Sequence, residues 1–469
     1  SEGADIVFND KVLVNGTVII DSNDDANDGV ITFSTSIDGV DGTGDDLTIN
    51  SGAGTLTLQA IGATQALSTL NINTAATSTA NISLPNIGDA GNDGVDGATN
   101  IGNSLTNQLT ISGTIYKTGG ATDYEAKSGN TILLTGVSPT ITTGGADLSF
   151  STGNLVLSSA GTTTFTTGSG SAGGITVAGT IDGTNGQNEA LALESGSGAI
   201  QLQGTIGGTN PVTTLAINST NGSAGTIEIV GIGDSDTTGA SSTATIGNTS
   251  TGTLTLDGTI YKTGGNQTYV ASATGNDSGQ NIDITGAATF TTTNDAVAFN
   301  TSGVDLANNG TTTINTGTGA GDVTFAAALE SNGGGNDDLT ITSGSGTVTF
   351  SNTVGAANAL GALSINASSG SGTITFSSTI GDAGNAGTTG TTAIGNDTTG
   401  TINLNSTLYK FDGGTTTITT TSGENIELGA TAATTIASAG ESLTFATGTI
   451  DLSNGTDLTI NSVGGAITI

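Results

Sequence analysis

The stretch DDLTINSGAGTLTL, residues 45–58, decides the fold of this chain. Apolar residues alternate with polar ones on both sides of the segment SGAG, which places aliphatic side chains on one face and mainly threonine on the other. Alternation at period two predicts two short β-strands, and the serine and glycine residues predict a tight turn between them. Runs of this kind fill the chain, and no stretch has the period, caps or length of a helix. We therefore expect an all-β protein.

The same stretch occurs twice more, as EALALESGSGAIQL at residues 189–202 and as DDLTITSGSGTVTF at residues 337–350. A second marker has the same period: LTISGTIYKTGG ends at Gly120, LTLDGTIYKTGG at Gly265 and INLNSTLYKFDGG at Gly414. A third marker is formed by VITF, GITV, DVTF and AITI, which begin at Val30, Gly174, Asp322 and Ala466. Three markers in one phase predict an internal repeat of about 146 residues.

These markers divide the chain into three long repeats, residues 34–177, 178–325 and 326–469, which we expect to form one continuous rod. Residues 1–33 would be the end of a preceding repeat. The strand at Ala466–Ile469 corresponds to strands that are each followed by another repeat, so we expect the native polypeptide to continue past Ile469.

Two all-β architectures fit such closely spaced strands. One is a β-solenoid (parallel β-helix), in which each coil of about 20 residues adds a layer of strands about 4.8 Å from the last. The other is a string of three β-sandwich modules, each with its own core. A sandwich core is usually anchored by large aromatic residues, whereas this chain has 3% aromatics, 77 glycines and a uniform texture without a distinct linker. We therefore predict the solenoid.

The composition excludes several kinds of chemistry. The chain has no Cys, no His and no Arg, since its five basic residues are all Lys, so it lacks zinc ligands of the usual kind, a Cys nucleophile and an imidazole base. A formal charge of −35 opposes binding to nucleic acid or to anionic lipid, and no apolar run is long enough for a membrane helix. The joint absence of Cys, Met and Trp, which are easily oxidised, favours an extracellular location.

The candidate catalytic residues are adjacent acids, Asp45 with Asp46 and Asp337 with Asp338, which suggest the carboxylate pair of a glycosidase. Neighbours in a strand point to opposite faces, however, and the second repeat has Asn188 and Glu189 at that position. The simpler interpretation is solvated acids in the turn that precedes a strand. We therefore predict no catalytic residues.

Calcium is the cofactor that the oxygen-rich composition suits best. DSNDDANDG places Asp21, Asn23 and Asp25 at the spacing of the first ligands of an EF-hand loop, although Ala26 stands where that loop has glycine. The alternatives are that no cofactor is bound, or that cations condense loosely on the acidic surface. The sequence names these three residues as a candidate calcium site.

The rare aromatic and basic residues mark one position in each repeat, as Tyr116–Lys117, Tyr261–Lys262 and Tyr409–Lys410. We expect a structural role, in which the tyrosine ring covers the core and the lysine lies among acids. The alternative is a contact point for a glycan or for a neighbouring copy of the chain, because tyrosine suits interfaces. Threonine runs such as TTTITTT also allow an ice-binding surface, although threonine suits half-exposed strands in any case.

GDDLTINSGAGTLTL, NDDLTITSGSGTVTF and ALGALSINASSGSGTITFSSTIG resemble the repeat arrays of bacterial filamentous-haemagglutinin-type adhesins and related giant surface proteins. The resemblance covers almost the whole chain and implies a long right-handed parallel β-helix that is exported and serves as a surface stalk or adhesin. Two features depart from that family: its amino-terminal secretion domain is not recognisable, and the repeat is longer than one coil. We therefore expect a non-catalytic extracellular rod whose partners are neighbouring copies, continuing repeats or surface glycans. The alternative is a calcium-dependent or glycan-binding module of a surface protein.

Overall fold

The computed structural model describes residues 3–23, 28–75, 77–168, 172–184, 188–220, 225–273, 280–332 and 337–469. The chain divides into two compact units, unit 1 (Ser1–Ala240) and unit 2 (Ser241–Ile469). The boundary between the two units, after Ala240, lies inside the second long repeat, which comprises residues 178–325. The described residues form strands, turns and bends, and none forms a helix that could span a membrane.

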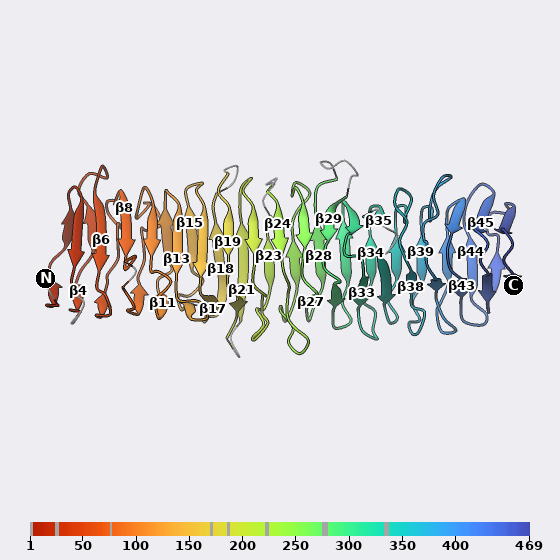
Figure 1. Cartoon of the computed structure of the whole chain (residues 1–469), viewed down its shortest axis with the longest axis horizontal. Helices are drawn as coiled ribbons and strands as arrows, with labels where there is room; N and C mark the ends of the chain where they lie inside the picture. The colour runs from red at the N-terminus through yellow and green to blue at the C-terminus, as the bar shows by residue number, and fades with distance from the viewer. Residues whose placement is uncertain are drawn as a thin grey trace. The chain divides into compact units, whose positions relative to one another are not determined.

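Unit 1 is a parallel β-solenoid whose chain visits three faces in turn (Figure 1). The first face consists of β1 (Ile6–Phe8), β4 (Ile31–Phe33), β7 (Leu56–Thr57), β9 (Ile82–Leu84), β11 (Gln108–Ile111), β14 (Thr131–Leu134), β17 (Asn154–Leu157) and β20 (Ile181–Asp182). The second face contains β2 (Val12–Val14), β5 (Ile37–Gly39), β12 (Ile115–Thr118), β15 (Thr140–Thr143), β18 (Gly161–Thr166), β21 (Glu189–Glu194) and β23 (Leu215–Ile217). Single bridges at Ile61 and Ile87 connect β5 to β12. The third face contains β3 (Val18–Asp21), β6 (Asp46–Asn50), β8 (Thr69–Ile72), β10 (Thr99–Ile101), β13 (Thr122–Glu125), β16 (Leu148–Thr152), β19 (Ile175–Val177), β22 (Ile200–Leu202) and β24 (Ile227–Ile229).

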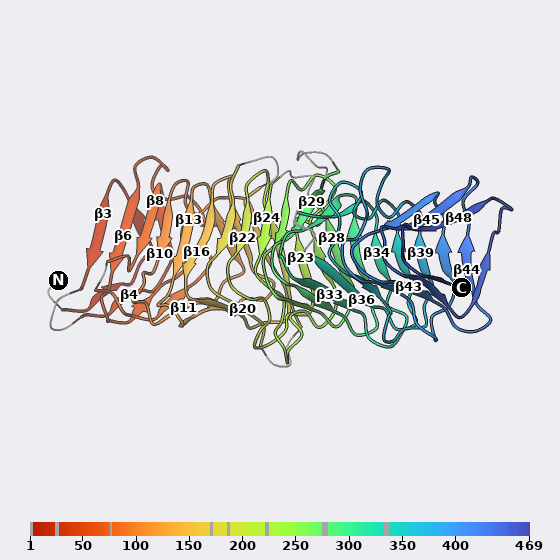
Figure 2. The ribbon, with the colours of Figure 1, turned by 45° about the vertical axis from the view of Figure 1, so that its right-hand side comes forward.

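Unit 2 is also a three-sided parallel β-solenoid, and Figure 2 shows its strands following one another side by side. The phenylalanine face contains β25 (Ala244–Ile246), β28 (Gln267–Val270), β31 (Val297–Asn300), β34 (Val323–Phe325), β37 (Val348–Phe350), β39 (Ile374–Phe376), β41 (Ile402–Leu404), β44 (Asn425–Leu428) and β47 (Thr449–Asp451). The acidic face contains β26 (Leu254–Leu256), β29 (Gln280–Ile284), β32 (Gly303–Leu306), β35 (Leu329–Ser331), β42 (Leu408–Phe411), β45 (Thr434–Ser438) and β48 (Leu458–Ser462). Single bridges at Val354 and Ile380 connect β35 to β42. The Tyr261 face contains β27 (Ile260–Lys262), β30 (Thr289–Thr291), β33 (Thr311–Asn315), β36 (Asp338–Thr342), β38 (Leu363–Ile365), β40 (Thr392–Ile394), β43 (Thr416–Thr419), β46 (Leu443–Ala446) and β49 (Ile467–Thr468).

The prediction of an all-β solenoid with parallel strands is thus confirmed within each unit. The local reason is the alternation seen in the sequence, since a typical strand such as β34 buries Val323 and Phe325 and leaves Thr324 half-exposed between them. Identical positions of successive coils pair in register, so buried side chains stack on buried side chains. This stacking supplies each coil with a core that it could not form alone.

An aromatic column in the core of unit 2 is the largest departure from the small-residue interior that the composition suggested. Stacked rings follow one another on the phenylalanine face with centroids 5.2, 5.0, 5.1 and 4.9 Å apart. The rings belong to Tyr269, Phe299, Phe325, Phe350 and Phe376. Offset aromatic pairs contribute about 0.5–1.5 kcal/mol each beyond their burial. These five rings therefore stabilise the stacking of coils on the phenylalanine face.

The coils are longer than the predicted length of about 20 residues. The shortest described spacing is 22 residues, from Ile282 to Val304, and the longest is 30, from Gln267 to Val297. The reason is that each coil contains three strand positions and three turns, and most of the variation lies in the turns.

The long repeat does not contain a whole number of coils. From Tyr261 the chain of unit 2 completes five coils on the Tyr261 face, ending at Ile394, and then crosses the phenylalanine face before it reaches Tyr409 on the acidic face. Unit 1 shows the same shift. Asp38 and Asp182 occupy the same position of two successive repeats, but Asp38 lies on the second face and Asp182 on the first. Within each unit, equivalent residues of successive repeats therefore point in different directions.

Candidate functional site: an acidic ladder in unit 2

Three carboxylates stack on the acidic face of unit 2. The pairing of β29 with β32 places Asp283 beside Asp305, and the pairing of β32 with β35 places Asp305 beside Glu330. All three point away from the core, because their strand neighbours Ile282, Val304 and Leu329 point inward and are buried. Neighbouring strands in a sheet lie about 4.8 Å apart, so the three charges are forced close together. We call these three residues the acidic ladder.

Glu330, the last member of the ladder, is buried and has several partners. Its side chain is 3% exposed and accepts hydrogen bonds from the backbone N–H groups of Ala356, Ala357 and Asn358 at 3.2, 3.1 and 2.8 Å. This carboxylate thus fastens a turn of the next coil. A carboxylate with several N–H donors tolerates burial better than one without them.

Asp337 brings a fourth carboxylate to the ladder. It is 2% exposed and accepts hydrogen bonds from the N–H groups of Asn308 and Asn309 and from the hydroxyl of Ser331. Asp305 differs from both, because its Oδ1 atom is buried without a hydrogen-bond partner. Asp305 is therefore the least compensated charge of the group.

Charge repulsion and burial act together on the ladder. Burial and then the charges of Asp283, Asp337 and Glu330 raise the pKa of Asp305 to about 6. Burial also raises the pKa of Asp283, and it raises the pKa of Glu330 against the opposing effect of the backbone hydrogen bonds. All three charges that act on Asp305 are negative. The ladder consequently takes up a proton at a higher pH than an ordinary carboxyl group does.

Unit 1 has the same pair of buried acids without the ladder. Asp38 and Asp45 are both fully buried and correspond in the repeat to Glu330 and Asp337. The residue that pairs with Asp38 on the neighbouring strand is Leu13, where Glu330 has Asp305. Lys11 also forms an ion pair with Asp38 at 3.0 Å. The repeat thus supplies the acid pair, and unit 2 adds further negative charge to it.

The pKa values of the two equivalent acids in unit 1, Asp38 and Asp45, move in the opposite direction. Burial alone would raise the pKa of Asp38, but hydrogen bonds from Thr64, Lys11 and Gln65 outweigh it and lower the pKa. The same balance lowers the pKa of Asp45, which accepts hydrogen bonds from the N–H groups of Val40, Asp41, Gly42 and Gly16. These carboxylates are stabilised in their ionised form.

The candidate calcium ligands lie in unit 1, and Asp25 is outside the described residues. Asp21 ends β3, and its Oδ1 accepts a hydrogen bond of 2.8 Å from the N–H of Asn23. The amide of Asn23 donates to the hydroxyl of Thr77 at 2.8 Å. In the part of the chain that the structure describes, no three acidic side chains are grouped as ligands for a metal ion. Calcium binding at Asp21, Asn23 and Asp25 stays a prediction.

The adjacent acids of the sequence do not act as pairs. Asp45 and Asp337 are buried, whereas Asp46 and Asp338 start strands and lie half-exposed on the other side. The interpretation of the first acid in each pair as a solvated turn residue is wrong, because these side chains hold neighbouring turns through backbone N–H groups.

Each of the three Tyr–Lys marks consists of a buried tyrosine ring and a half-exposed lysine. Tyr116, Tyr261 and Tyr409 are fully buried, and the hydroxyl of each accepts a hydrogen bond from the backbone N–H three residues earlier. Burial raises the pKa of all three. Any contact with a partner would therefore be made by the lysine.

Two of the three lysines, Lys117 and Lys410, border pockets. Lys117 forms an ion pair of 3.1 Å with Asp93 in a pocket of about 280 Å³, and Lys410 donates to the carbonyl of Ala383 at 3.4 Å beside another of about 250 Å³. Lys262, the lysine of the remaining Tyr–Lys mark, is the last residue of β27. Since Lys262 and Lys410 lie on different faces of unit 2, their regular spacing in the sequence does not align them in space.

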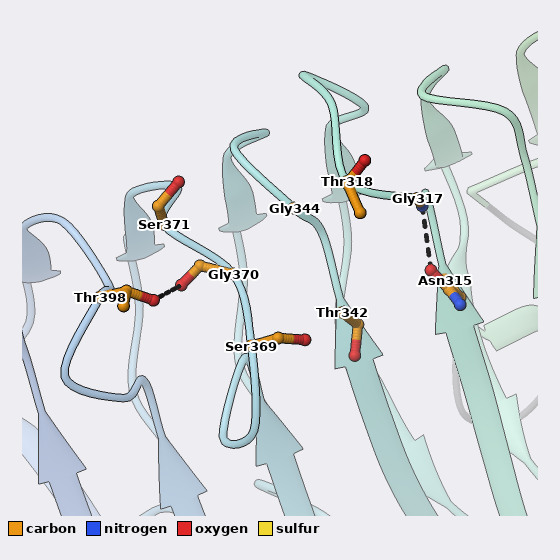
Figure 3. Close-up of a pocket in the computed structure, with 9 residues that line it drawn as sticks. All are labelled: Asn315, Gly317, Thr318, Thr342, Gly344, Ser369, Gly370, Ser371 and Thr398. Atoms are coloured by element: carbon orange, nitrogen blue, oxygen red, sulfur yellow. Dashed lines mark hydrogen bonds between the residues drawn. The ribbon is translucent and has the colours of Figure 1, made fainter.

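A neutral groove of about 390 Å³ crosses the turns of four successive coils in unit 2 (Figure 3). It is lined by Asn315, Gly317, Thr318, Thr342, Gly344, Ser369, Gly370, Ser371 and Thr398. Two of its polar side chains form hydrogen bonds with other residues of the groove. The hydroxyl of Thr398 donates to the carbonyl of Gly370 at 3.2 Å, and the side-chain oxygen of Asn315 accepts from the N–H of Gly317 at 2.9 Å. The groove offers hydroxyl and backbone groups and no charged side chain.

Sequence reasoning missed the ladder because its members are far apart in the chain. Asp283, Asp305 and Glu330 are separated by 22 and 25 residues, which is close to the length of one coil. That spacing identifies the ladder only once the coil length is known. The short alternating strands of the sequence do not reveal the coil length.

Comparison with known proteins adds no family to this description, because no family model, no curated protein and no solved structure matches the chain.

Proposed function

We propose that the chain is a non-catalytic structural protein of the cell surface, in which stacked coils form the stalk of an adhesin or part of a surface filament. The observation that carries the proposal is the in-register stacking of buried side chains from coil to coil in each unit. Such a stack gives every coil the same support on both sides, which suits a spacer better than a cleft for a substrate.

The composition supports a structural function. The chain lacks His, Cys and Arg, so the usual bases, nucleophiles and carboxylate clamps are missing. The buried acids Asp45, Glu330 and Asp337 hold turns through hydrogen bonds and are thus committed to structure. The lack of Cys, Met and Trp supports an oxidising, extracellular setting.

Labelling of intact source cells tests this proposal. Antibody raised against the chain should stain unpermeabilised cells, and protease added outside the cells should remove the signal. Staining that requires permeabilisation would contradict a surface location. A screen of the purified chain against acidic and neutral polysaccharides should release no reducing sugar, and reproducible release would contradict the non-catalytic assignment.

A second candidate function is glycan binding, which the neutral groove in unit 2 favours. Its hydroxyl-rich lining suits hydrogen bonding to sugar hydroxyls, and it lacks the negative charge of the remaining surface. Ser371→Tyr would obstruct the groove, whereas Ser377→Tyr, at an exposed serine of the same unit outside it, is the matched control. A glycan bound by the wild type and the control but lost in Ser371→Tyr would support the function; equal binding by all three proteins would refute this site.

A further inference from the structure

The acidic ladder concentrates charge that the fold does not neutralise. The strands β29, β32 and β35 fix Asp283, Asp305 and Glu330 as register neighbours, so their Cα atoms cannot move apart without breaking the sheet. Asp305, in the middle, has a buried oxygen without a hydrogen-bond partner. A buried polar atom without a partner destabilises the folded state, more so when the group is charged.

The groups that face the ladder are acids and backbone amides. Asp283 acts on Asp305 from β29, Glu330 acts on it from β35, and Asp337 acts on it from the segment that precedes β36. On its far side, Glu330 meets the N–H groups of residues 356–358 and the more distant charge of Asp382. On the other side of the ladder, Asp283 pairs with Thr255 of β26, which is neutral. Among the described residues packed against Asp305, no cation therefore offsets its charge.

Equivalent places in unit 1 show that the fold does not require this arrangement. The strand neighbour of Asp182 is Val156, and the strand neighbour of Asp38 is Leu13. An aliphatic residue thus occupies the position of Asp305 in both cases. The carboxylate of Asp305 is an addition to a motif that is complete without it.

We propose that the acidic ladder makes the stability of unit 2 sensitive to protons, so that its acidic face is held more tightly in mild acid than at neutral pH. Protonation of the ladder removes one of the adjacent negative charges and supplies an O–H donor to a cluster of acceptors. This inference goes beyond the structural role proposed above, since it would hold for a spacer, a filament or a binding module.

The direction of the effect follows from the titration of Asp305. Burial and the neighbouring charges raise the pKa of Asp305 to about 6, against a usual value of 3.8. Between these values the folded chain binds more protons than the unfolded chain, so unit 2 gains stability as the pH falls from about 7 towards about 4. The destabilisation is fully present above the folded pKa and is absent below the unfolded one.

Hydrogen exchange of the full chain, followed by mass spectrometry, tests the proposal. The wild type is labelled at about pH 7.5 and about pH 5, with labelling times scaled to the intrinsic exchange rate at each pH. Peptides that contain β29, β32 and β35 should be about three- to tenfold more protected in acid, which allows for partial solvent screening of the ladder. Peptides around Asp38 in unit 1 should keep the same protection, because the pKa of Asp38 is lowered and not raised.

Two variants make the test specific. Asp305→Asn keeps the shape of the side chain and removes its charge, so its ladder peptides should lose most of the acid-dependent protection, and only the raised pKa values of Asp283 and Glu330 would leave a remainder. Asp397→Asn removes the same charge at an exposed position of unit 2 and should behave as the wild type. A wild type without acid protection, or an Asp305→Asn variant that retains it, would overturn the proposal. If Asp305→Asn does not fold, Asp305→Val, which copies the neighbour of Asp182 in unit 1, replaces it.

Discussion

The buried acids of unit 1 and unit 2 occupy the same position of the long repeat and have opposite electrostatic surroundings. Asp38 has Leu13 as its strand neighbour, an ion pair with Lys11 and two backbone N–H donors. Glu330 also holds a turn, but its strand neighbour is Asp305, itself beside another acid. The comparison shows that burial alone does not decide the behaviour of a carboxylate. Hydrogen-bond donors and neighbouring charges decide whether it anchors the fold or strains it.

The largest effect is expected where a carboxylate anchors the fold. Asp38→Ala would remove the charged acceptor of the N–H groups of Thr64 and Gln65, at a cost of about 2 kcal/mol. Urea denaturation followed by circular dichroism should show a lower free energy of unfolding for this variant. Asp10→Ala removes an exposed acid of the same unit and serves as the control. Equal stability of Asp38→Ala and the wild type would show that the carboxylate is not an anchor.

A change of the opposite sign is expected in unit 2. Asp305→Val removes the uncompensated charge and restores the aliphatic residue found beside Asp182, so unit 2 should gain about 1 kcal/mol at neutral pH after allowance for solvent screening. This corresponds to a rise in melting temperature of about 2–4 °C for a unit of this size. Calorimetry at neutral pH measures it. A lower melting temperature would mean that Asp305 contributes a stabilising contact in the folded state.

The pH dependence of stability should distinguish Asp305 of unit 2 from the buried acids Asp38 and Asp45 of unit 1. Because the pKa of Asp305 is raised to about 6, unit 2 should become more stable as the pH falls from about 7 to about 4. The pKa values of Asp38 and Asp45 are lowered, so the stability that they supply is present above their unfolded pKa of 3.8 and is lost as the pH falls further. Calorimetric scans at several pH values should show both trends, and parallel responses of the two units would contradict the comparison.

The smallest effect is expected from calcium. Both carboxylate oxygens of Asp21 already accept hydrogen bonds, from the N–H of Asn23 and from the amide of Asn50. We expect the melting temperatures in millimolar calcium and in chelator to differ by no more than about 1 °C, because cations that only screen the surface charge diffusely give no site-specific stabilisation. A fall of several degrees in chelator, abolished by Asp21→Asn, would instead establish a specific site at Asp21, Asn23 and Asp25.

The sequence predicted the strands and their mode of stacking better than the candidate sites. Alternation in VTF at Val348–Phe350 correctly indicated which side chains are buried, because the two faces of a strand differ only in the identity of alternate residues. The rings of the Tyr–Lys marks are buried, as the expected structural role requires, but the marks of unit 2 lie on different faces. The sequence had offered a contact point for a glycan or a neighbouring copy only as the alternative.

By itself, the sequence determined the all-β class, the parallel solenoid, the long repeat and the lack of His, Cys and Arg, because local alternation and composition are properties of the chain. Only the tertiary structure decided which residues become neighbours between coils. A turn that is a few residues longer changes which distant residue pairs with a given strand, so Asp283, Asp305 and Glu330 form a ladder only when the intervening turns bring them into register. The electrostatic difference between the two units arises at that step, because it depends on the distances between charges and not on their number.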